Sequence, residues 1–233
     1  MTDLAAVLAT LLAAAMVGVQ PFAGRARYQR LLAALAVDPT ARLRHFHRGI
    51  VGEWLAVVFV LVIGALAGRS AASIGLTTAR MGKVTGEVVE AVVVLAATAL
   101  LFRLHALREA IMAQARGFIA LLPRTAEERW AFAGLAVTAG ICEEILFRGF
   151  GIAYVRWLWP GASHAWLIVV TSIPFGFAHL YQGVRGVVLT GLLGALLASV
   201  VLGSGSLLPA MLLHGLLDLR VLALPDLERT EPA

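Results

Sequence analysis

Two adjacent glutamates and an arginine lie inside a long apolar stretch of this sequence. Residues 142–148 read Cys-Glu-Glu-Ile-Leu-Phe-Arg, and the apolar run around them begins at Trp130. At membrane depth each charge costs roughly 2.5–3.5 kcal/mol, even on the lenient insertion scale. A chain can keep such groups only where they face a protein interior or a water-filled cavity. We therefore expect Glu143, Glu144 and Arg148 to face other polar side chains inside a helical protein.

The composition indicates an integral membrane protein. The chain is 60% hydrophobic and 14% charged, with a mean hydropathy of +0.88. Soluble domains average about 45–50% apolar and about 25% charged residues. The length of 233 residues suits one all-α, polytopic transmembrane bundle of about seven to eight spans, which would enclose a polar catalytic cavity. The net charge of +5 does not indicate nucleic-acid binding, because the arginines cluster in predicted loops.

Hydrophobic runs predict where the spans lie. We expect seven of them, at residues 4–22, 49–67, 88–102, 130–159, 164–181, 186–202 and 206–224. Residues 23–48 are an arginine-rich loop in this interpretation, with a short interfacial helix at 28–37. Residues 103–129 fit an amphipathic helix on the membrane surface. An eighth span could lie within residues 28–37 or 104–122.

The arginines also predict the orientation. The arginine-rich segments 23–48 and 103–129 fall on the same side as the C-terminal tail, and positive loops stay in the cytoplasm. We therefore expect a cytoplasmic C-terminus. The bias toward Ala, Gly, Leu, Val and Arg favours a GC-rich bacterial genome, so the predicted location is the bacterial inner membrane, with multiple passes.

Two histidines in later spans are candidates to meet the glutamates. Pro160-Gly161 predicts a turn, with Glu143 lying 17 residues before Pro160 and His179 lying 19 residues after it. At about 1.5 Å per residue, a helical hairpin would place the two side chains within about 3 Å of the same depth. This register predicts one shared polar site.

Helical spacing groups the remaining polar residues. His214 and Asp218 are four residues apart, so they share one face of the last span. Glu144 and Arg148 have the same spacing, with the acid first, which favours an ion pair. Glu143 points about 100° away from that pair. One glutamate can thus be neutralised while the other remains available for chemistry.

These residues suggest a hydrolytic site. A carboxylate near an imidazole in a low-dielectric cavity has its pKa raised toward the range of a general base. Glu143 and His179 could activate a water, and His214 with Asp218 could stabilise an oxyanion. Alternatively, Glu143, His179 and His214 could bind zinc as a two-His, one-carboxylate set. The cofactor is therefore left open between none and zinc, and no His-Glu-x-x-His motif favours the metal.

Three motifs resemble those of the CPBP intramembrane protease family, which includes CAAX prenyl endopeptidases and bacterial bacteriocin-processing and Abi proteins. The motifs are Glu143-Glu144-x-x-x-Arg148, Phe175-x-x-x-His179 and His214-x-x-x-Asp218, and the resemblance covers about residues 126–222. It implies a multi-helix membrane fold around a cavity.

The resemblance also implies a role for each motif residue. Glu143 and His179 would activate water, His214 and Asp218 would stabilise the oxyanion, and Glu144, Arg148 and Phe175 would support the site. Asp218 stands where the prenyl endopeptidases have Asn. The implied partners are the lipid bilayer and a membrane-associated peptide or protein substrate.

Function and domain organisation follow as expectations. We expect an intramembrane endopeptidase with transmembrane helices and amphipathic cytoplasmic loops at 1–125, a CPBP/Abi-like catalytic core at 126–224 and a short polar tail at 225–233. The alternatives are a small transporter or an ion or proton carrier, and a non-catalytic immunity or scaffold protein with the same fold. Glu53 and Glu90 lie near predicted span ends, where solvation or pairing with loop arginines is expected.

Overall fold

A computed structural model describes residues 2–77 and 118–223, and within them the chain is helical with no strand. The α-helices are α1 (Asp3–Gly18), α2 (Gln20–Leu35), α3 (Ala41–Leu66), α6 (Ala126–Glu143), α7 (Gly151–Leu158), α8 (His164–Ala178), α9 (Gly183–Ser204) and α10 (Leu208–Leu219). A π-helix, η3 (Glu144–Phe150), joins α6 to α7. Short 3₁₀-helices are η1 (Ala71–Ile74), η2 (Ile119–Leu121), η4 (Leu180–Gln182) and η5 (Arg220–Ala223).

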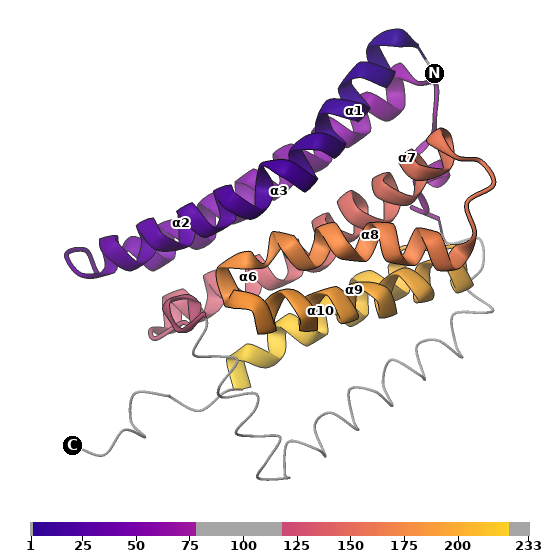
Figure 1. The fold of residues 1–233 in the computed structure, drawn as a ribbon. Helices are drawn as coiled ribbons and strands as arrows, with labels where there is room; N and C mark the ends of the chain where they lie inside the picture. Colours follow the sequence, from indigo (N-terminus) through magenta and orange to yellow (C-terminus); the bar gives the residue numbers. More distant parts are fainter. Residues whose placement is uncertain (1, 78–117, 224–233) are drawn as a thin grey trace.

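The first three helices form one layer of the bundle (Figure 1). The axes of α1 and α2 differ by 51°, and the break precedes Pro21, which has no backbone N–H to continue the helical hydrogen bonds. Helix α3 returns alongside both, and the Thr2 hydroxyl at the start of α1 donates to the Leu66 carbonyl at the end of α3, over 3.2 Å. This layer lies against α6, η3, α7 and α8.

Helix α6 begins at a well-defined cap. The Thr125 hydroxyl accepts the Glu128 N–H at 3.1 Å, and the Glu128 carboxylate accepts the Thr125 N–H at 3.3 Å, which is a capping box. The same carboxylate binds Arg42 of α3, with Nη1 to Oε1 at 3.0 Å, and both side chains are buried. This contact ties the start of α3 to the start of α6.

Close helix packing depends on glycines at two crossings. A Cβ on Gly140 of α6 would lie 2.7 Å from the backbone of Gly215 of α10. A Cβ on Gly176 of α8 would lie 2.6 Å from the Val187 carbonyl of α9. At both crossings the backbones pack too closely for any larger residue.

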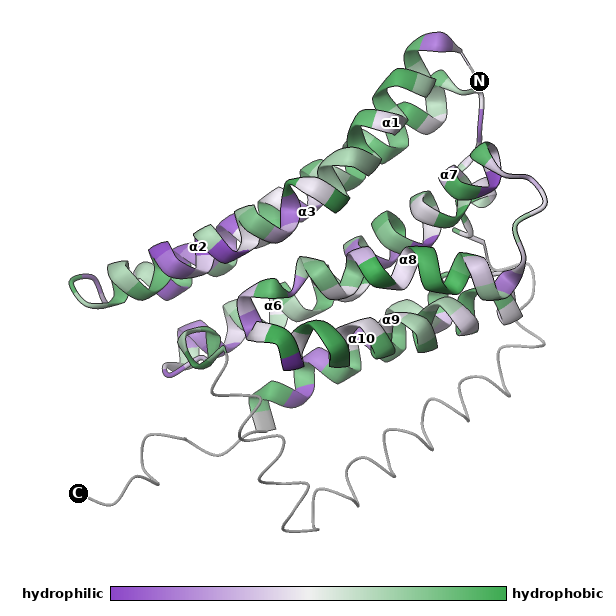
Figure 2. Cartoon of the chain, viewed as in Figure 1, coloured by the Kyte–Doolittle hydropathy of each residue, from purple (hydrophilic) through white to green (hydrophobic). Residues whose placement is uncertain are grey.

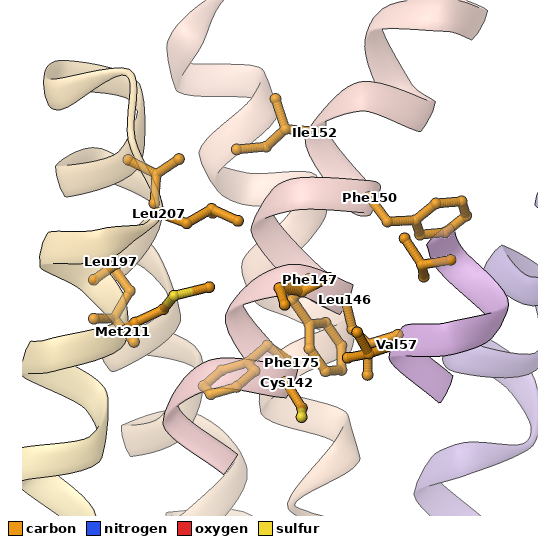
Figure 3. Close-up of a cluster of buried hydrophobic side chains, with 14 of the residues drawn as sticks. Val57, Cys142, Leu146, Phe147, Phe150, Ile152, Phe175, Leu197, Leu207 and Met211 are labelled. Carbon is orange, nitrogen blue, oxygen red and sulfur yellow. The ribbon is translucent and has the colours of Figure 1, made fainter. Parts of the chain in front are cut away.

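The core is apolar and lies around η3, where residues from every layer meet. Figure 3 shows side chains from α3, α6, η3, α8, α9 and α10 converging there. The outer faces of the helices are also apolar, and Figure 2 shows the hydrophilic residues of the first layer concentrated on α2 and the first half of α3. Large apolar side chains such as Leu55, Leu192 and Leu212 are more than half exposed, as suits helices that face lipid.

The membrane-span prediction is confirmed only in its helical character. In the described part of the chain, three helical segments are long and apolar enough to cross a membrane, or four if α1 and α2 form one bent span. Helices α8 and α10 have 15 and 12 residues and are shorter than a full span. The predicted span at 88–102, and most of the amphipathic helix at 103–129, lie outside the described residues. The count of seven to eight spans is not confirmed.

The predicted loop at residues 23–48 is wrong. Most of it is helical, because α2 runs to Leu35 and α3 already begins at Ala41. Arginine is a good helix former, so an arginine-rich segment need not be a loop. Arg42 is moreover buried and paired, rather than solvated.

A pocket of about 120 Å³ lies between α1, α3, η1 and α7. Its lining is mostly apolar and includes Ala9, Val60, Tyr154 and Trp157. The glutamates and histidines singled out from the sequence do not line it. The predicted polar catalytic cavity is therefore not confirmed by this pocket.

Candidate active site

Glu144 is the most enclosed acid of the site. It is the first residue of the π-helix and has no exposed surface. Its Oε1 accepts hydrogen bonds from Arg148 Nη1 at 2.7 Å and from His214 Nδ1 at 2.9 Å. The predicted i,i+4 ion pair is present, and it also holds a histidine from a helix far along the chain.

Arg148 links this acid to the other helices of the core. Its Nη2 donates to the Gly194 carbonyl of α9 over 3.1 Å, and its guanidinium lies 4.1 Å from the centre of the Phe175 ring of α8. A Cβ at Gly194 would come within 3.1 Å of Nη2, so the glycine leaves room for the cation. Arg148 thus joins η3, α8 and α9, which fits the supporting role expected for Arg148 and Phe175.

His214 faces three carboxylates. With Nδ1 bound to Glu144, its Nε2 lies 3.9 Å from Glu143 Oε2 and 3.6 Å from Asp218 Oδ2. Both Nε2 distances are too long for a hydrogen bond. The ring itself is buried, whereas the side chains of Glu143 and Asp218 are 17% and 37% exposed. Nε2 therefore makes no direct hydrogen bond to these two acids and remains available to another group.

His179 lies at the C-terminal end of α8, where helix carbonyls lack intrahelical partners. Its Nδ1 lies 2.9 Å from the Phe175 carbonyl oxygen. A carbonyl can only accept, so this bond places a proton on Nδ1 and leaves the lone pair of a neutral ring on Nε2. The ring is thereby prepared to accept a proton at Nε2.

Phe175 lies beside both imidazoles. Its ring centroid is 5.0 Å from that of His179 and 5.7 Å from that of His214. No ion pair within 4.0 Å joins Glu143 to His179; the nearest such partner of Glu143 is His214. The structure thus gathers the predicted residues around Phe175 and His214, and it pairs Glu143 with the histidine of the last helix.

One acid near this site was misinterpreted from the sequence. Glu53 was expected at a span end, but α3 begins at Ala41, so Glu53 lies well inside the helix. Its carboxylate interacts electrostatically with Glu143, His214 and Asp218, as well as with Arg27. The helical spacing of Glu53 with the buried Val57 and Val60 could have indicated this position. Glu90 lies outside the described residues.

The zinc alternative requires three donors that converge on one point. Among the residues that the structure describes, no group of three or more His, Cys, Asp or Glu side chains is arranged to hold a metal ion. The Nδ1 atoms of His179 and His214 are bound to the Phe175 carbonyl and to Glu144, so only their Nε2 atoms remain as possible metal ligands. The set Glu143, His179 and His214 does not fit a zinc site in this geometry.

The arrangement can be compared with known proteins. Residues 125–220 match a family model described as type II CAAX prenyl endopeptidase Rce1-like. No curated protein and no solved structure matches the chain. The matched segment contains all the site residues predicted from the three motifs, whereas Glu53 lies outside it.

Proposed function

We propose that this chain, whose residues 125–220 match the Rce1-like family model of type II CAAX prenyl endopeptidases, hydrolyses a peptide bond of a membrane-associated substrate. The observation that supports this most directly is the space between Glu143 and His214. Glu143 Oε2 is buried without a hydrogen-bond partner among the described residues, and His214 Nε2 faces it over 3.9 Å. An oxygen atom in this space could accept a hydrogen bond from His214 Nε2, while a second group donates a hydrogen bond to Glu143 Oε2.

Glu143 and His179 activate the water in this proposal. The Glu143 carboxylate accepts one hydrogen of the water, and the free Nε2 lone pair of His179 accepts the other. As the water oxygen attacks the carbonyl carbon, Glu143 takes up the proton. Glu143 later delivers that proton to the leaving nitrogen, so the peptide bond breaks into a carboxylic acid and an amine, and the acid then loses its proton to the free Nε2 of His179 or to solvent.

His214 stabilises the oxyanion that forms on the former carbonyl oxygen. Its Nδ1–H is held by Glu144, so a second proton on Nε2 makes the ring an imidazolium that can donate to the oxyanion. Three carboxylates surround this cation, those of Glu143, Glu144 and Asp218. Asp218 interacts with both imidazoles and orients them in this arrangement.

The test uses purified protein in detergent and an internally quenched peptide that ends in a CAAX sequence, with and without S-farnesylation. We expect wild type to cleave the peptide, and E143Q and H179A to lower kcat by about 100- to 10,000-fold each. The exposed acid Glu127 supplies the control E127Q, which should match wild type. Equal turnover by wild type, E143Q and H179A, or no turnover by wild type, would reject the proposal.

A further inference from the structure

Glu53 lies, partly buried, on the core-facing side of the largely apolar second half of α3. Phe46, Val57, Val60 and Ile63 are buried on the same helix, and Glu53 falls one turn before Val57 in this series. Figure 3 shows Val57 beside Leu146, which follows Glu144 by two residues in the sequence. An acid in such a stripe costs stability unless it has a polar partner.

The Glu53 carboxylate has an unused acceptor. Its Oε2 is buried and has no hydrogen-bond partner among the described residues. The same carboxylate interacts electrostatically with Glu143, His214 and Asp218, so it belongs to the surroundings of the reaction site. The mechanism proposed above gives it no role.

Helix α6 separates Glu53 from His214. Its residues Gly134 and Leu135 contact Ile50 and Gly49 of α3, and its residue Gly140 contacts Gly215 of α10. Figure 1 shows α6 between the layer of α3 and the pair formed by α9 and α10. Glu53, an acceptor on α3, and His214, a donor on α10, therefore approach Glu143 at the end of α6 from different sides.

A scissile peptide unit needs both a donor and an acceptor. Its C=O and N–H point in opposite directions in the trans form, and each must be satisfied once water is excluded. His214 supplies the donor for the carbonyl, and Glu143 and His179 are occupied by the water. Of the proposed site residues, none accepts the substrate N–H.

We propose that Glu53 is a further catalytic residue, whose buried Oε2 accepts a hydrogen bond from the N–H of the scissile amide. The bond strengthens as the nitrogen takes the proton from Glu143 and leaves as an amine, because the N–H becomes a stronger donor when positive charge develops on the nitrogen. This inference rests on the proposed peptidase function and assigns to α3, outside the matched family segment, the recognition of the leaving group.

The test compares two quenched substrates that differ in one atom. One is the CAAX peptide, and the other is its ester analogue, in which oxygen replaces the scissile N–H. Wild type, E53Q and E53L are assayed with both. We expect E53L to lose about 10- to 100-fold in kcat/KM on the amide, the value of a hydrogen bond to a charged group, while its kcat/KM on the ester is unchanged. E53Q keeps an acceptor oxygen and should lie closer to wild type than E53L.

Controls separate this inference from the peptidase proposal. E127Q should match wild type on both substrates, and E143Q should lose about 100- to 10,000-fold in kcat on both. Equal losses on amide and ester in E53L and E53Q would show a structural role and overturn the inference, as would an unaffected amide rate in E53L. Turnover by E143Q equal to that of wild type would instead reject the proposed function itself.

Discussion

His214 and Glu144 are joined by a hydrogen bond of 2.9 Å, from Nδ1 to Oε1, although they lie 70 positions apart in the chain. The bond crosses the interface between α10 and the π-helix. It fixes which nitrogen of His214 faces Glu143 and Asp218. The second glutamate of the pair thus sets the orientation of a histidine as well as neutralising Arg148.

Loss of Glu144 should damage both stability and turnover. Replacing it by alanine leaves the Arg148 guanidinium buried without its carboxylate, and breaking a buried pair in this way costs about 3–5 kcal/mol. E144Q keeps an acceptor oxygen and should be less destabilised, but should still lower kcat because His214 is held less firmly. Thermal unfolding and turnover of E144A, E144Q and E127A measure both effects. Wild-type stability in E144A would contradict this prediction.

The contact of Gly140 with Gly215 should tolerate no side chain. A methyl group at Gly140 would lie 2.7 Å from the Gly215 backbone, so α6 and α10 must move apart in G140A. We expect a loss of about 1–3 kcal/mol in unfolding free energy, as for other overpacked cores, with reduced kcat because His214 shifts relative to Glu143. The control is G52A, since an added Cβ at Gly52 meets no atom within 4 Å. Equal unfolding temperatures for the two variants would refute the close crossing.

The pair formed by Arg42 and Glu128 should matter for folding and not for chemistry. Both side chains are about 5–6% exposed, and Arg42 Nε also donates to the Ala120 carbonyl at 2.8 Å. E128A should lose about 3–5 kcal/mol of stability. Because Glu128 lies about 22 Å along the helix from Glu143, turnover per folded molecule should persist. A fall in kcat of E128A at an unchanged unfolding temperature would contradict the prediction that this pair affects folding and not chemistry.

Chelation distinguishes the water-activating mechanism from the zinc alternative. Glu143, His179 and His214 do not converge on one point as a zinc site requires, within the part of the chain that the structure describes. We therefore expect turnover to survive prolonged dialysis against 1,10-phenanthroline. The measurement is activity before and after dialysis, together with the zinc content of the protein. Inactivation that added zinc reverses would support the metal instead.

Helical spacing predicted the local pairs of the site well. The Glu144–Arg148 ion pair and the shared face of His214 and Asp218 follow from four-residue spacing, and the structure shows both contacts. The family assignment from three short motifs is confirmed by the match over residues 125–220. These features depend on positions within one helix or on residue order, which a sequence contains directly.

Contacts between helices were harder to predict. The hairpin register placed Glu143 near His179 in depth, but it gave no information on helix rotation, and the histidine found within 4.0 Å of Glu143 is His214. The π-helix widens the turn at Glu144, which a regular 100° step does not anticipate. Glu53 was misjudged because the start of α3 was placed eight residues too late, at Gly49 instead of Ala41. When charge alone is used to find loops, the arginine-rich start of a helix such as α3 is assigned to a loop.

The π-helix also constrains how this sequence can change. Gly151 N–H donates back to the Leu146 carbonyl, five residues earlier, so the segment contains one residue more than regular α-helical winding would need. Deleting one residue between Glu144 and Arg148 would let α-helical hydrogen bonds resume while α7 keeps its orientation relative to α6, because only the extra residue is removed. The bond of Tyr154 to Thr10 of α1, 3.1 Å long, should then persist. Such a single-codon deletion should thus change the spacing of the Glu144–Arg148 pair while the first layer of the bundle stays connected.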